Sequence, residues 1–140
     1  MKVYLVTLGR GIKGPTHMQG ALALGDNGLY FLCCDTGRLG TYGFAKFGPI
    51  GLTLDEITKT GAVDVEIDEA ELAALVAATP HSYALSFDKV EVLSRSMWTG
   101  SKIVHSGGEK LVVWAPGFAG PFRQATRAWA ESKGIQTKGL

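Results

Sequence analysis

Three glycines and an acidic residue near the N-terminus have the spacing of a phosphate-binding loop. Gly9, Gly11 and Gly14 form a literal G-x-G-x-x-G after an apolar run at residues 3–6. A second apolar run at residues 29–32 is soon followed by Asp35. If a helix follows the loop, its amides would hold a pyrophosphate and Asp35 would bind a ribose hydroxyl. On this interpretation the chain is a small nucleotide-binding enzyme that uses the Gly9–Gly14 loop.

In the alternative interpretation, the same residues are antiparallel strands joined by turns. The segment Gly25-Asp26-Asn27-Gly28 separates apolar runs at residues 21–24 and 29–32, and its residue types tolerate the positive φ values of tight turns. The nucleotide interpretation instead needs a helix over residues 15–24, which Gly20 and Gly25 weaken. Strand and helix patterns also fail to alternate beyond residue 35, as a doubly wound sheet would require. The sequence therefore favours turn glycines between strands.

Other residue types that carry chemistry occur without a recognisable arrangement. The histidines, His17, His81 and His105, match no metal-ligand spacing and are expected at turns or on the surface. Cys33 and Cys34 are adjacent, so in a strand they point to opposite faces; we expect a reduced pair with one thiol in the core and one near the surface. With no G-x-S-x-G motif either, we expect no enzyme activity, metal or cofactor.

Basic and aromatic residues give weaker indications of binding. The net charge of +1 does not favour nucleic-acid binding. A cluster of cations that could meet an anionic lipid is predicted from Arg10, Lys13 and Lys102. Aromatic side chains that could contact a protein partner are Tyr42, Phe44, Phe47 and Trp98, whereas Trp114 and Trp129 are expected in the core.

Length and composition indicate one globular domain. The chain has 140 residues, of which 46% are hydrophobic and 19 are glycine, so it can bury a single core and contains many turns. No apolar run reaches the roughly 18 to 20 residues that span a bilayer, so we expect a cytoplasmic protein, peripheral to the membrane if it binds lipid. The sequence specifies neither the partner nor the oligomeric state, and a homo-oligomer is compatible with it.

Hydrophobic periodicity predicts the remaining elements. Asp68 and Glu71 begin a helix that runs from about Glu69 to Ala78 and ends at Pro80. Alternating apolar residues predict strands at 83–87 and from 90, with a bend at residues 88–89, and a hairpin of residues 102–105 with 110–115. A helix over residues 121–134 has its apolar stripe at Phe122, Ala125 and Trp129. The glycine-rich segment 36–51 is predicted to be a connection or a distorted strand, or else an apolar loop that meets a partner or membrane.

Residues 20–32, GALALGDNGLYFL, resemble the opening hairpin of bacterial pleckstrin-homology-like (PH-like) and GRAM-like domains. Residues 81–92 resemble a later strand of that fold, and residues 110–129 resemble its closing strand and C-terminal helix. The resemblance implies an α+β fold, an antiparallel β-barrel or half-barrel with an inserted helix, an insertion at about residues 36–80 and a C-terminal capping helix. It also implies a noncatalytic interaction module that binds a protein segment or, alternatively, an anionic lipid headgroup.

Overall fold

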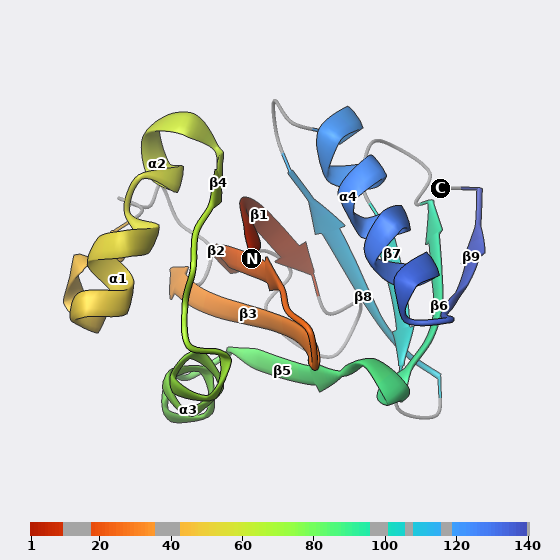
Figure 1. The fold of residues 1–140 in the computed structure, drawn as a ribbon, viewed down its shortest axis with the longest axis horizontal. Helices are drawn as coiled ribbons and strands as arrows, with labels where there is room; N and C mark the ends of the chain where they lie inside the picture. The colour runs from red at the N-terminus through yellow and green to blue at the C-terminus, as the bar shows by residue number, and fades with distance from the viewer. Residues whose placement is uncertain (10–17, 36–42, 96–100, 106–107, 116–118, 140) are drawn as a thin grey trace.

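Figure 1 shows the computed structural model of the chain, which describes residues 1–9, 18–35, 43–95, 101–105, 108–115 and 119–139. One large sheet dominates the fold, with three helices at one end of the molecule and a longer helix over the other end. The α+β class predicted from the sequence is therefore confirmed.

Within the described residues the sheet has nine strands, and all pairs except one are antiparallel. Their order is β5-β3-β2-β1-β8-β7-β6-β9, and β4 pairs with β1 beside this path. The strands are β1 (Lys2–Gly9), β2 (Met18–Leu24), β3 (Gly28–Asp35), β4 (Ala62–Asp64), β5 (Tyr83–Ser86), β6 (Val90–Arg95), β7 (Ser101–His105), β8 (Glu109–Trp114) and β9 (Gln136–Lys138). Of the predicted alternatives, barrel or half-barrel, the barrel is wrong, because β5 and β9 end the sheet in the described part of the chain without pairing to each other.

The β2–β3 hairpin confirms the turn predicted at residues 25–28. Leu24 pairs with Leu29, and the Gly25 amide donates to the Gly28 carbonyl over 2.8 Å. Residues 18–24 are a strand paired with β1 along their whole length, where the nucleotide interpretation needed a helix. Gly9 ends β1, and the rest of the glycine motif lies outside the described residues.

The inserted segment is more helical than the sequence indicates. The predicted helix, α3 (Glu69–Ala78), is confirmed at both ends, and the Asp68 side chain caps it by accepting from the Glu71 amide. Before it come the 3₁₀ turn η1 (Ala45–Phe47) and the short helices α1 (Pro49–Leu54) and α2 (Ile57–Thr60). The described part of segment 36–51 is thus largely helical, where a loop or a distorted strand was expected.

These helices cover one face of β1, β2 and β3. Phe44, Ile57 and Leu72 pack with Ala21 and Leu32 in a second apolar cluster, separate from the main core. Strand β1 contributes side chains to both clusters, since Val3 belongs to the second cluster and Val6 to the main core. The central strands are therefore buried on both faces, which explains why their sequences are nearly continuous apolar runs.

The main core lies on the other face of the sheet, where α4 (Ala119–Ser132) packs against β8, β7 and β6 (Figure 1). The Phe122 ring meets Tyr4 edge to face, with centroids 5.2 Å apart. Trp129 is 8% exposed, which confirms its predicted place in the core. Trp114, in contrast, is only half-buried on the opposite side of β8, so its assignment to the core is wrong.

Between β5 and β6, the predicted bend is the 3₁₀ turn η2 (Phe87–Lys89). The predicted hairpin of residues 102–105 with 110–115 is confirmed as β7 and β8, with Val104 opposite Lys110. The sequence analysis missed β9, which pairs in parallel with β6 after Gly134 ends the helical segment with φ 71°.

Trp129→Ala is expected to lower the free energy of unfolding by roughly 3 to 5 kcal/mol, because it removes a buried aromatic ring and leaves a cavity. Arg127→Ala is the matched control: Arg127 is exposed and its Nε donates to the exposed Glu131 carboxylate over 3.1 Å, so its removal is expected to cost less than about 1 kcal/mol. Urea unfolding measures both values. Equal effects of the two substitutions would contradict the assignment of α4 to the core.

Candidate functional site

The β2–β3 turn is the point where the most polar contacts from distant elements converge. The Glu69 carboxylate, at the start of α3, accepts hydrogen bonds from the amides of Asp26 (3.1 Å) and Asn27 (2.8 Å). From α4, Trp129 Nε1 donates to the Gly25 carbonyl over 2.7 Å. From η2, the Phe87 amide donates to the Asn27 carbonyl over 3.0 Å. Three elements thus satisfy the backbone groups that the turn leaves without partners in the sheet.

Local sequence explains how Glu69 reaches this turn. Asp68 caps α3, so Glu69 is the first helical residue and lies where the helix dipole favours a negative charge. The Glu69 carboxylate also accepts from the Tyr30 hydroxyl over 2.8 Å. Gly25 is required for this approach, because a Cβ atom there would collide with Glu69 Oε1.

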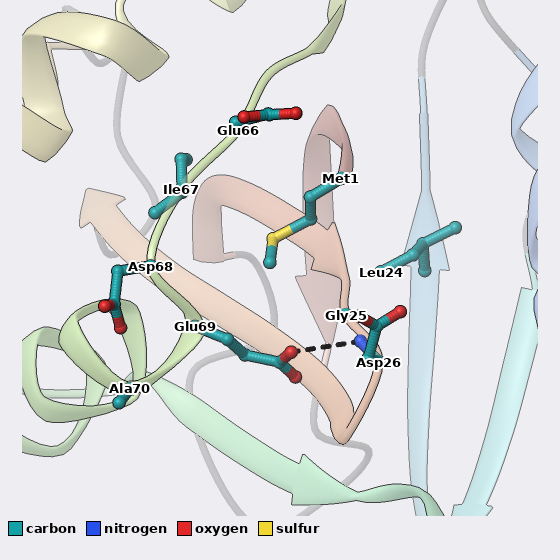
Figure 2. A pocket seen from close by; sticks show the side chains of 9 residues that line it. All are labelled: Met1, Leu24, Gly25, Asp26, Glu66, Ile67, Asp68, Glu69 and Ala70. Atoms are coloured by element: carbon teal, nitrogen blue, oxygen red, sulfur yellow. Dashed lines mark hydrogen bonds between the residues drawn. The ribbon is translucent and has the colours of Figure 1, made fainter.

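A hollow of about 480 Å³ lies beside these contacts, between the start of β1, the β2–β3 turn and the segment that leads into α3. Its acidic lining residues are Asp26, Glu66, Asp68 and Glu69, and Figure 2 shows them with the Glu69–Asp26 hydrogen bond. The Met1 amino group donates nearby to Asp64 Oδ1 (3.2 Å) and the Val65 carbonyl (3.0 Å).

The carboxylates of Asp68 and Glu69 already hold the helix start and the turn, while Asp26 and Glu66 are exposed. The hollow is therefore chiefly a structural junction with an acidic rim. No signal in the sequence pairs Glu69 with residues more than 40 positions earlier, so this junction was not predicted.

Tyr30 belongs to the same junction, because its hydroxyl donates to Glu69. Three causes together raise the pKa of its hydroxyl from 10.0 to about 12: burial, which is the largest, then the hydrogen bond to Glu69, then the negative charge of that carboxylate. The hydroxyl is therefore a hydrogen-bond donor throughout the physiological pH range. In the folded state it is a fixed donor to Glu69 and has no acid–base role near neutral pH.

A second hollow, of about 320 Å³, lies at the end of β3 and brings together residues with reactive side chains. Its lining includes Cys33, Cys34, Lys46 and His81. Lys46 Nζ donates to the Cys34 carbonyl over 3.0 Å, and Cys34 Sγ donates to the Gln19 carbonyl over 3.2 Å. The Lys46 amine and the Cys34 thiol are therefore both engaged with backbone carbonyls.

The two thiols point to opposite faces of β3, as the strand pattern predicts, since Cys33 belongs to the main core and Cys34 to the second cluster. Both are buried, 5% and 8% exposed, so the prediction that one lies near the surface is wrong.

Of the two histidines that the structure describes, one lies where the sequence analysis expected it and the other does not. His81 is exposed with φ 61°, in agreement with a turn position. His105 is 4% exposed, with Nε2 4.0 Å from Glu109 Oε2, and is therefore neither at the surface nor in a turn. Across the part of the chain that the structure describes, no three His, Cys, Asp or Glu side chains are grouped as metal ligands.

The structure describes three of the seven residues predicted to bind a lipid or partner. Lys102 is half-buried in β7 and shares a row across the sheet with Val112 and Gly9, the residue that precedes Arg10. Phe44 is fully buried in the second cluster, which leaves no ring surface for a partner in this conformation. Phe47 is half-buried, and Lys46 Nζ lies 5.2 Å from its ring centroid. The other predicted residues, Arg10, Lys13, Tyr42 and Trp98, lie outside the described residues.

Comparison with known proteins identifies no family model that matches the chain and no curated protein with significant similarity. Among the described residues, no helix combines the length and apolar character needed to cross a membrane.

Glu69→Ala is expected to lower the free energy of unfolding by about 2 to 3 kcal/mol, because three donors lose a charged acceptor at once. Glu66→Ala removes an exposed carboxylate from the same hollow and is expected to change stability by less than about 0.5 kcal/mol. Both are measured by urea unfolding. If the two variants were equally stable, Glu69 would not be the anchor of the turn.

The Tyr30 hydrogen bond is expected to stabilise the fold fully below pH 10 and to lose this effect as the pH approaches about 12. Between these values the unfolded chain releases the tyrosine proton before the folded chain does, so rising pH favours unfolding. The difference in unfolding free energy between the protein and Tyr30→Phe should therefore shrink from pH 10 to about 12. A difference that stays constant over this range would show that the hydroxyl is not held by Glu69.

Proposed function

We propose that this protein is a noncatalytic interaction module of the PH-like type that binds a protein segment. The observation that carries the proposal is the order of its elements. One antiparallel unit contains β1, β2, β3 and β5, a second contains β6, β7 and β8, and the C-terminal α4 packs on the core between them. This order agrees with what the resemblance to PH-like domains implies.

The character of both hollows supports a binding role over a catalytic one. In the acidic hollow the carboxylates of Asp68 and Glu69 are committed to the helix start and the turn. At the end of β3, the Cys34 thiol and the Lys46 amine donate to backbone carbonyls. Side chains that hold the backbone in this way are not free to act as nucleophile or base without local rearrangement.

Binding to an anionic lipid is the second candidate, and one observation favours it. Lys102 lies two strands from Gly9 in the same row, which corresponds to about 10 Å between Cα atoms. Arg10, one of the predicted cations, follows Gly9 directly in the sequence. Two or three cations contribute on the order of 1 kcal/mol each at an anionic membrane surface, which is weak for stable docking.

The purified protein is expected to show no rise in melting temperature with NAD, NADP or ATP, because β2 occupies the place of the helix that a nucleotide loop needs. It is also expected to sediment little with vesicles that contain phosphatidylserine or phosphoinositides at about 0.15 M salt, where the Debye length is about 8 Å.

A rise of several degrees in melting temperature with a nucleotide would contradict both the assignment as an interaction module and the absence of catalysis. Tight, salt-sensitive binding to vesicles that is lost in an Arg10→Ala, Lys13→Ala double variant would instead establish the lipid candidate.

A further inference from the structure

One face of the sheet has no helix over it in the described part of the chain: the side of β8, β7, β6 and β9 that points away from α4, here called the outer face. Ile103, Leu111 and Val113 point into the main core. Because side chains alternate along a strand, Lys102, Val104 and the even-numbered residues of β8 point the other way.

The strand registers place four apolar residues together on the outer face. Val92 lies opposite Val104, Val104 is two residues from Lys102, and Lys102 lies opposite Val112. Trp114 follows two residues after Val112 on the same side of β8. Val92, Val104, Val112 and Trp114 are all half-buried, although no element of the described chain packs on them in either apolar cluster.

Three lysines lie among these apolar residues and at the edge of the face. Lys110 lies opposite Val104, and Lys102 lies opposite Ser94, which is paired in turn with Lys138. Lys110 and Lys138 are exposed. Of the described carboxylates on these strands, Glu109 falls on the other side of β8 by alternation, and Glu91 lies at the bulge between Val90 and Val92. The outer face thus combines apolar side chains with lysines, of which Lys102 lies on its central strand β7 and Lys138 on its edge strand β9.

We propose that the outer face binds a short acidic segment of a partner protein, whose apolar side chains lie on Val104, Val112 and Trp114 and whose carboxylates pair with the lysines. This inference rests on the proposed function and specifies the surface and the chemistry of the partner.

The charge of the outer face excludes self-association through two copies of it, because Lys102, Lys110 and Lys138 would face like charges. Its size argues against a large globular partner. Four strands span about 15 Å, and their length of at most six residues corresponds to roughly 20 Å, so the outer face covers roughly 300 Å², whereas a stable protein–protein interface buries about 800 Å² on each partner. A lipid surface fits less well, because the valines and Trp114 are half-buried and so offer little exposed apolar area for insertion.

The test selects peptides from a random 12-residue library on the immobilised full chain. The selected peptides are expected to combine Asp or Glu with apolar residues and to bind more weakly as salt rises. A carbodiimide, which joins amines to carboxylates, is expected to link them to Lys102, Lys110 or Lys138, as located by mass spectrometry. A Lys102→Glu, Lys110→Glu variant is expected to bind them at least tenfold more weakly.

The matched control is a Lys2→Glu, Lys59→Glu variant, which makes the same change in net charge at two exposed residues of β1 and α2 and is expected to retain binding. If the peptides bound the Lys102→Glu, Lys110→Glu variant as tightly as the unchanged protein, the outer face would not be the binding surface. The proposed function as an interaction module would still hold. Failure to select any peptide would overturn both. Binding to phosphatidylserine vesicles that is lost in the same variant would overturn the inference and assign the outer face to lipid.

Discussion

The arrangement of the whole chain depends on the β2–β3 turn and on the groups that satisfy its backbone. Glu69 from α3, Trp129 from α4 and the Phe87 amide from η2 all bond within three consecutive residues of this turn. The bond from Trp129 to the Gly25 carbonyl is buried, where an unsatisfied backbone group would cost about 1 to 3 kcal/mol, whereas the bonds from Asp26 and Asn27 to Glu69 are exposed. The turn therefore links the layer of helices on one face of the sheet to α4 on the other.

The sheet takes its shape from β1, because one edge of this strand is divided between β4 and β8. One edge of β1 pairs with β2 over seven residues, while the other edge pairs with β4 near Val3 and with β8 near Leu8. Because β8 overlaps only the end of β1, the sheet continues as two offset halves. Tyr4, Val6 and Leu8 pack with residues of β7, β8 and α4 in the core between those halves, and the sheet stays open at β5 and β9.

The inserted helices determine which surface remains available to a partner. They cover the outer side of β1, β2 and β3, where an uncovered sheet would expose Ala21, Leu32 and their neighbours. The outer face of β8, β7 and β6 has no such cover within the described residues. Its apolar side chains are fewer, and lysines lie between them. The sequence difference between the two halves follows from this: two-sided burial requires continuous apolar runs, and one-sided burial permits alternation.

Elements that depend on local chemistry could be predicted from the amino-acid sequence. The glycine-rich turn at residues 25–28, the capped start of α3 at Asp68 and the apolar stripe of α4 were all correctly predicted, because their residues interact within a few positions of one another. Contacts between residues far apart in the chain could not be predicted in this way: Glu69 with the turn, Phe44 in the second cluster, the burial of both cysteines and the position of Trp114 outside the core. Periodicity shows which residues share a face of an element. Which other element covers that face depends on the packing of the whole chain, and no local pattern records it.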